Sequence, residues 1–346
     1  MGPGNRFGTR EEIDMSQKRV TIREVAALAE VSISSVSRYL SDPGSINPVM
    51  AFRIKEAIKE LKYVPNTFAQ NLRRGQSTTV GLVVPNLEFF FAKVSHAISD
   101  YFYNQNYVTL ICESDNEADK EQFFIRQLIE NHVAGIIVSS SGRNPLFLQE
   151  TYQTFPNMVL LDSVENLHCD VVTEDHEQNA CQLIKYVLTH NRCDSLELLL
   201  GERLGMDTCL SLRGVERALR ETGKTDQAVH MYYGCRREDS LSGAVAQVHD
   251  SMGGSRPTFV GFEPDFIERA VIAMNRMDPT MKKQVDLAGY AMRNTINKIG
   301  RKFPCIIRNP EEVGITAAQV LYRRITDTAE QKPCTHQICS IYQLEK

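Results

Sequence analysis

The sequence has no apolar run near the roughly 18 residues that a membrane-spanning helix needs, and its longest runs, such as residues 80–84, are strand-sized. The first 17 residues contain no apolar stretch, so we expect no secretory signal, and we take residues 1–17 as a leader outside the fold. The nine cysteines are an odd number without a CxxC pair, which disfavours a disulfide framework and a zinc site. These absences predict a cytoplasmic protein without a membrane partner.

Catalytic signatures are missing as well. No GxGxxG, GxxxxGK[ST], GxSxG or HExxH pattern stands where a strand or helix would place it, and the eight histidines have no metal-ligand spacing. We therefore expect no catalytic residue, no metal site and no cofactor.

The charge is distributed unevenly along the chain. Its 346 residues carry a net charge of −4, and this length is typical of two to three domains. Residues 18–76 hold ten Lys or Arg and five Asp or Glu, so the rest of the chain is acidic. A small basic module on a large acidic body indicates an anionic partner for that module, such as nucleic acid, although an ordinary solvated surface has the same composition.

The basic module has the pattern of three short helices. Thr21 is a predicted N-cap with Glu24 as its capping-box partner, and Ser32 is a second N-cap. The Ser-Asp-Pro-Gly stretch at 41–44 ends the second helix, and a third follows at about 48–61. Three helices with a tight turn between the first two predict a helix-turn-helix.

In a helix-turn-helix, the start of the second helix reaches base edges in the major groove. Arg38 has the donors to grip guanine, and Ile33 is suited to pack on a thymine methyl group, whereas each serine alone is as well explained as a solvated helix residue. The predicted DNA-contacting residues of this module are Thr21, Arg23, Ser32, Ile33, Ser34, Ser35, Ser37 and Arg38.

Residues 66–76 predict a short hinge helix capped by Asn66. About eight residues are too few for a stable helix in water, so we expect it to form only against DNA or a twin copy. Leu72 beside two arginines suits an apolar wedge in the minor groove, and Ala69 and Gln70 complete the predicted contacts. The alternative is a plain linker whose Leu72 packs on the body.

From residue 79, short apolar runs alternate with amphipathic stretches. Such alternation predicts parallel βαβ units, and about ten strands favour two lobes over one sheet. The cleft at the strand ends is then the expected ligand site, and Asp162, directly after a strand, either contacts the ligand or caps a turn. The predicted strands lie at 80–84, 108–112, 134–138, 159–161, 196–200, 230–232, 259–260, 285–289 and 305–307, and the helices at 91–103, 120–131, 175–190, 210–222, 241–250, 266–276 and 311–326.

Residues 20–82 resemble the DNA-binding headpiece and hinge of LacI/GalR-family transcription regulators. The matching stretches are Val20-Thr21-Ile22, Glu24-Val25-Ala26, Val31-Ser32, Val36-Ser37-Arg38, Tyr63-Val64-Pro65-Asn66, Ala69-Gln70 and Leu72. The resemblance implies a homodimer whose paired hinge helices insert Leu72 at the centre of a pseudo-palindromic operator in double-stranded DNA. Glu30 departs from the family's usual glycine in the turn, which strains the backbone, and Met50 replaces a threonine that contacts phosphate.

The body is similar to the periplasmic-binding-protein-like core of the same family. The resemblance places the effector contacts near Ser139, Asp162, Ser211, Asp265 and Ala291. Ser211 replaces the family's arginine and Ala291 its aspartate, so an ordinary free sugar loses two bidentate partners. Arg203 or Arg213 replaces that grip, or the signal is a phosphorylated metabolite or a partner protein.

We therefore expect an all-α helix-turn-helix headpiece at 18–65, a hinge at 66–76 and an α/β core of two parallel-sheet lobes at 77–346. The N-lobe is expected at 77–173 and 304–328, and the C-lobe at 174–303 and 329–346. The predicted function is a sequence-specific DNA-binding regulator, a repressor, controlled by a sugar or sugar phosphate in the inter-lobe cleft at Ser139, Asp162, Ser211, Arg213 and Asp265. The alternatives are a core that responds to a phosphocarrier-like partner protein, a solute-binding protein, and an enzyme on the same fold.

Overall fold

A computed structural model of the chain describes residues 20–64, 77–162, 167–203, 205–327 and 332–344. The chain divides into two compact units, Met1–Gln76 and Ser77–Lys346. The predicted leader and the hinge residues Asn66, Ala69, Gln70 and Leu72 lie outside the described residues. In the described part, no helix combines the length and the apolar character needed to cross a membrane.

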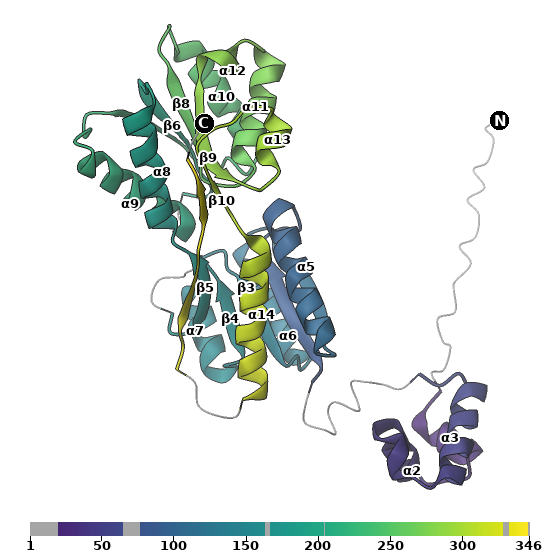
Figure 1. The fold of residues 1–346 in the computed structure, drawn as a ribbon. Helices are drawn as coiled ribbons and strands as arrows, with labels where there is room; N and C mark the ends of the chain where they lie inside the picture. The colour runs from purple at the N-terminus through teal and green to yellow at the C-terminus, as the bar shows by residue number, and fades with distance from the viewer. Residues whose placement is uncertain (1–19, 65–76, 163–166, 204, 328–331, 345–346) are drawn as a thin grey trace, which may run out of the picture. The chain divides into compact units, whose positions relative to one another are not determined.

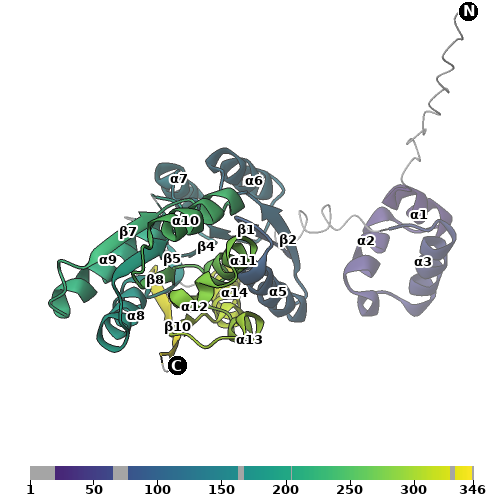
Figure 2. The ribbon, with the colours of Figure 1, turned by 90° about the horizontal axis from the view of Figure 1, so that it is seen from above.

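The first unit is a small helical bundle, with α1 (Ile22–Leu28), α2 (Ile33–Ser41), the single turn η1 (Pro43–Ser45) and α3 (Pro48–Glu60) (Figure 2). The backbone N–H of Thr21 donates to the Glu24 carboxylate at 2.6 Å, and the Glu24 N–H donates back to the Thr21 hydroxyl at 3.4 Å, which completes the predicted capping box. Val25, Val36 and Ile54, one from each helix, are fully buried in its core. The predicted helix-turn-helix is confirmed.

The turn between α1 and α2 contains the expected strain. Glu30 has a φ of 52°, in the left-handed region that glycine adopts without cost and other residues avoid. Its carboxylate forms an ion pair with Arg53 of α3. Glu30 thus joins the turn to the third helix at a position where a glycine has no side chain to do so.

The N-lobe of the core is built on a six-stranded sheet in the order β11-β5-β4-β3-β1-β2, with every neighbouring pair parallel. Its strands are β1 (Thr79–Val84), β2 (Val108–Glu113), β3 (Gly135–Ser139), β4 (Met158–Leu161), β5 (Asp170–Glu174) and β11 (Thr335–Ile338). Helices α5 (Phe89–Asn104) and α14 (Pro310–Thr326) pack together on one face (Figure 1), and α6 (Ala118–Glu130) and α7 (Pro145–Thr154) cover the other.

The C-lobe repeats this plan in the order β12-β10-β9-β8-β6-β7, with β12 antiparallel to β10. Its strands are β6 (Ser195–Leu199), β7 (Ala228–Tyr232), β8 (Pro257–Gly261), β9 (Asp286–Ala291), β10 (Cys305–Ile307) and β12 (Ile341–Gln343). One face carries α8 (His176–His190) and α9 (Met206–Glu221), and the other α10 (Glu238–Ser251), α11 (Phe266–Met277), α12 (Met281–Gln284) and α13 (Thr295–Ile299). Helices α8 and α9 approach closely because Gly214 has no Cβ, which would lie 2.2 Å from the Glu177 carbonyl oxygen.

The chain passes between the lobes three times, after β5, after β10 and after β11. The C-terminal lobe boundaries therefore differ from those expected from the sequence. Cys305 pairs with Gly289 of β9, so β10 belongs to the C-lobe rather than to an N-lobe segment starting at 304. Thr335 pairs with Val171 of β5, so β11 belongs to the N-lobe rather than to a C-lobe segment starting at 329. Backbone pairing decides the lobe of a short strand, and the local apolar pattern does not encode it.

Candidate DNA-reading helix and inter-lobe cleft

The first turn of α2 presents a set of linked hydroxyl groups. Ser32 caps the helix by accepting the Ser35 N–H at 3.1 Å, and its hydroxyl also bonds those of Ser34 at 2.7 Å and Ser35 at 2.8 Å. Between them, Ile33 is 40% exposed, although it is a large apolar residue. The turn therefore offers one apolar side chain and a set of hydroxyls that are already oriented.

The predicted cationic contacts of the same unit are also accessible. Arg23 of α1 and Arg38 of α2 are exposed, and Ser37 is half-buried. The Thr21 hydroxyl donates to Glu24 at 2.9 Å and is therefore already engaged in capping. Met50, where the family has threonine, lies half-buried near the start of α3.

A cavity of about 130 Å³ lies between the two lobes of the core. It is reached by the carboxyl ends of strands from both sheets, where parallel α/β proteins bind ligands. Of the predicted effector residues, Ser139, Asp162 and Asp265 line it.

The other predicted effector residues are placed elsewhere. Ser211 is buried within α9 and Arg213 is exposed on it, and the cavity meets α9 only at its first residues, Met206 and Asp207. Ala291 is buried at the end of β9, and Arg203 lies over the ring of Tyr233, outside the lining. Arg213 of α9 therefore does not replace, at the cavity, the arginine that the family has at the position of Ser211.

The C-lobe wall of the cavity contains one arginine shared by two acids. Arg236 donates through Nε to Glu263 at 2.7 Å and through Nη2 to Asp207 at 3.3 Å. Burial raises the pKa of Glu263 to about 7 in spite of Arg236, and the nearby charges of Asp207 and Asp265 act in the same direction as burial. A Cβ on Gly201 would lie 2.7 Å from the Glu263 Oε1, so glycine at that position allows the carboxylate to lie there.

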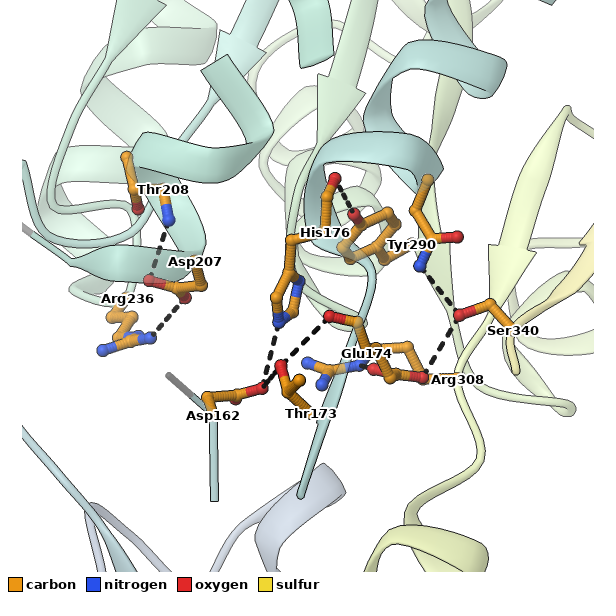
Figure 3. A network of polar contacts seen from close by, with 11 residues as sticks. Asp162, Thr173, Glu174, His176, Asp207, Thr208, Arg236, Tyr290, Arg308 and Ser340 are labelled. Carbon is orange, nitrogen blue, oxygen red and sulfur yellow. Dashed lines mark hydrogen bonds and ion pairs between the residues drawn. The ribbon is translucent and has the colours of Figure 1, made fainter. Parts of the chain in front are cut away.

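The N-lobe wall contains a buried ion pair. His176 donates through Nε2 to the Asp162 Oδ1 at 3.0 Å, the Thr173 hydroxyl donates to the same oxygen at 3.2 Å, and Figure 3 shows the three side chains meeting. Burial alone raises the pKa of Asp162, but the His176 charge and its hydrogen bond lower it to about 2. Burial opposes a charge on His176, and Asp162 raises the pKa of that imidazole. The opposite charge and the hydrogen bond therefore favour the ionised form of both residues.

A second polar network ties the lobe crossings together. Arg308, directly after β10, pairs with Glu174 at the end of β5 (Figure 3). Its guanidinium carbon lies 3.9 Å from the ring centroid of Phe90. The Ser340 hydroxyl, on the third crossing, donates to Glu174 at 3.4 Å and accepts the Asn179 amide at 2.8 Å. One buried carboxylate thus contacts all three crossings, which places the hinge of the lobes beside the cavity.

Comparison with known proteins relates the chain to one group of regulators. The family described as "Bacterial regulatory proteins, lacI family" matches residues 21–66, which are the helix-turn-helix unit. The "HTH-type transcriptional repressor PurR" of Aliivibrio salmonicida (strain LFI1238) is 26% identical over 319 residues, which cover 90% of this chain and 94% of that protein. The helix-turn-helix unit thus matches the lacI family, and nearly the whole chain is similar to a transcriptional repressor.

Solved structures of transcription regulators share the fold of this chain. A lac repressor dimer bound to operator and the anti-inducer ONPF has a TM-score of 0.77 at 17% identity, covering 94% of this chain and 98% of that one. A complex of the transcriptional regulator CelR with cellobiose has a TM-score of 0.66 at 20% identity, covering 94% and 99%. The predicted headpiece and two-lobed core are confirmed.

These comparisons confirm the predicted function, a DNA-binding transcriptional repressor with a ligand-binding core. The relatives are named as transcription regulators rather than enzymes, and a core that responds to a partner protein is not favoured.

Sequence reasoning missed seven of the nine charged residues that line the cleft, among them Arg236, Glu263 and Arg308. Arg236, Glu263 and Arg308 each stand within four residues of the end of a strand, β7, β8 and β10. A charged residue just after a strand of a parallel sheet is the signal that marks them. The same rule found Asp162.

Proposed function

We propose that the chain is a homodimeric repressor that reads the two half-sites of a pseudo-palindromic operator, and that a small molecule in the inter-lobe cleft sets its operator affinity. The observation that carries the proposal is the cavity itself, since its walls come from both lobes and it lies beside the three crossings. A ligand held by both walls favours one lobe arrangement over another, which is the requirement for a population shift.

The reading of DNA rests on α2. Ile33 is exposed in the first turn, where it meets a thymine methyl group, and Arg38 has the paired donors that guanine accepts in the major groove. Ser34, Ser35 and Ser37 add hydroxyls to the same helix. We propose that Thr21, the N-cap of α1, and Arg23 within α1 contact the phosphate backbone.

The second copy is proposed to pack against the edge of the N-lobe sheet. Strand β2 is an edge strand, and its side chains Val108, Leu110 and Ile111 are exposed together with Tyr103 of the adjoining α5. An exposed edge strand with apolar side chains is unusual in a monomer because it invites pairing. The similar lac repressor structure is itself a dimer on its operator.

The transmission step uses residues 66–76. We propose that lobe closure changes the spacing between the two copies of this segment, so that Asn66, Ala69, Gln70 and Leu72 engage the minor groove in one lobe arrangement and release it in the other. The ligand and the operator are then coupled through the same population shift.

The test of operator reading is the selection of bound duplexes from a random pool. We expect a pseudo-palindrome with a flexible pyrimidine–purine step at its centre. Arg38→Ala should weaken binding of the dimer to the selected duplex by roughly 30-fold or more, because it removes one bidentate base contact of about 1–3 kcal/mol from each half-site, and it should relax the preference at one base pair of each half-site.

The matched control is Arg220→Ala, which removes an exposed arginine of α9 in the other unit and should leave the affinity unchanged. A consensus without two-fold symmetry, or an Arg38→Ala variant that loses affinity equally for every sequence, contradicts the proposal.

A further inference from the structure

The cavity between the lobes has an excess of acidic groups. Six of its lining residues are Asp or Glu, and three are Arg. Four of the acids, Glu202, Asp207, Glu263 and Asp265, belong to the C-lobe. Its wall is thus more acidic than a site for phosphate or carboxylate, where arginine and lysine usually outnumber acids.

The arginines of the cavity are already held by carboxylates of the chain. Arg269 donates to Asp265 at 3.2 Å and to Glu238 at 3.3 Å. Arg236 is shared by two acids and Arg308 is paired with a buried one, as described above. An anionic ligand would have to displace these intramolecular partners, whereas a cation would meet carboxylates that share a guanidinium.

The raised pKa of Glu263 also indicates that the cavity has too little positive charge to balance its acids. Its pKa stays near 7 although Arg236 lies 2.7 Å away, because burial and the charges of Asp207 and Asp265 outweigh that arginine. A cation placed beside the three acids would favour the ionised form of Glu263 and would itself be stabilised by it.

The N-lobe adds aromatic surface to the cavity. Phe90 and Phe91, at the start of α5, both line it, with ring centroids 5.3 Å apart. Phe90 already binds a cation through its ring, the guanidinium of Arg308. Phe91 is partly exposed, so its ring is accessible from the cavity. Aromatic faces attract ammonium and guanidinium groups and give nothing comparable to an anion.

One buried hydroxyl in the cavity still lacks a partner. Ser139 is 7% exposed and lines the cavity, and its side chain makes no hydrogen bond to another described residue. Among the described residues, the hydrogen bonds to Asp162 both end on Oδ1, so Oδ2 is also open to a donor. Both groups accept hydrogen bonds, which a ligand N–H would supply.

Helix N-termini oppose this charge only in part. Helices α5, α9 and α11 begin at the cavity without side-chain caps, and each N-terminus acts as about half a positive charge. The lining residues include three more acids than arginines, although Asp162 pairs with His176 and Glu202 with Arg143, and Asp207 and Asp265 lie at two of these termini.

We propose that the cleft ligand is an organic cation, such as a primary amine, held between the acids of the C-lobe and the phenylalanines and Ser139 of the N-lobe. This inference rests on the proposed function, since it names the ligand class of the same cleft. A phosphorylated metabolite is then excluded as the effector.

The test is thermal unfolding of the full chain with two sets of matched probes. The first set is putrescine, butane-1,4-diol and succinate, which share a four-carbon chain, and the second is D-glucosamine, D-glucose and D-glucose 6-phosphate. We expect at least one amine at 10 mM to raise Tm by about 2 °C or more, with no rise from its neutral or anionic counterpart. An equal rise in Tm from a neutral or anionic probe, or no rise in Tm from either amine, overturns the inference.

Variants locate the cation. Glu263→Gln and Asp265→Asn should each reduce the amine-induced rise in Tm by at least half, whereas Glu216→Gln, on the exposed surface of α9, should leave it unchanged. Two acids are tested so that one poorly folded variant does not decide the result. An undiminished response in both variants overturns the placement.

Measurement of operator binding distinguishes failure of this inference from failure of the proposed function on which it rests. If D-glucose 6-phosphate raises Tm and changes affinity for the selected duplex, the proposal of a repressor controlled through its cleft is supported and the proposal of a cationic ligand is wrong. If an amine raises Tm without changing that affinity, the proposed ligand class is supported and the proposed coupling between the cleft and DNA binding is wrong.

Discussion

At the scale of single residues, several non-glycine residues with left-handed backbone stand at functional positions, among them Glu30 and Asp162. Glu30 lies in the turn before the recognition helix, with a φ of 52°, and Asp162 lies at the cavity, with a φ of 62°. Each is held by a charged partner, Arg53 and His176 respectively. Strained conformations persist where surrounding contacts over-determine them, and such positions cluster at binding sites.

Glu263 gives a residue-scale prediction about pH. Its pKa is raised from 4.5 to about 7, so the folded state holds this proton more tightly than the unfolded state. Its contribution to the free energy of unfolding is therefore greatest below pH 4.5, falls as pH rises to about 7 and is constant above. Glu263→Gln should remove this fall, as measured by urea unfolding of both proteins at pH 5, 6, 7 and 8.

The control for that series is Glu216→Gln, which should run parallel to the unmodified chain. If the difference between the unmodified chain and Glu263→Gln is the same at all four pH values, Glu263 does not titrate in this range and its assignment is wrong.

At the scale of elements, the lobe crossings are where local sequence and structure diverge most. Long amphipathic helices such as α9 and apolar strands such as β1 were predicted because their periodicity is strong over many residues. Helix α7 and strand β5 were not, since β5 has a mixed apolar and acidic sequence and α7 a weak apolar face. The lobes of β10 and β11 depend on which strand each one pairs with, β9 and β5 respectively, and for β11 that partner lies far away in the chain.

The candidate site likewise contains residues that the sequence predicted and residues that only the fold reveals. Asp162 was predicted because it directly follows an N-lobe strand, whereas Ser139 was expected only by resemblance. Arg236 and Glu263 lie in different loops, and only the folded C-lobe brings them to 2.7 Å. Ser211 and Arg213 were expected at the cleft by resemblance, but α9 reaches the cavity one turn earlier.

The crossings also give an element-scale prediction. Glu174→Gln leaves the Arg308 guanidinium buried beside a neutral partner, and breaking a buried pair in this way costs about 3–5 kcal/mol. We expect a loss near the lower end of that range in the free energy of unfolding, because Asp162 also lies close enough to favour the arginine's charge. Urea unfolding at pH 7 measures it.

Glu311→Gln is the matched control, because its pair with Lys93 joins α14 to α5 on the exposed surface. That variant should lose less than about 1 kcal/mol. Equal losses in Glu174→Gln and Glu311→Gln mean that the crossings are not held by the buried network.

At the scale of the whole molecule, the account requires two copies of the chain. Leu110→Lys places a charge on the exposed edge strand β2, where Leu110 is 41% exposed, and should convert the dimer to a monomer. Leu146→Lys, at a 76% exposed position of α7, should remain dimeric. Sedimentation equilibrium of the three proteins measures the change. A monomeric unmodified chain or a dimeric Leu110→Lys variant contradicts the proposal that this face is the dimer interface.

The coupling of cleft and headpiece is the central claim, and one titration tests it directly. Affinity for the selected duplex is measured by fluorescence anisotropy at fixed salt, without and with a saturating concentration of a compound that raises Tm. We predict a change of at least about fivefold, and the same factor when the affinity for the compound is measured with and without duplex, because linkage is reciprocal. Identical duplex affinities in both conditions would contradict the account.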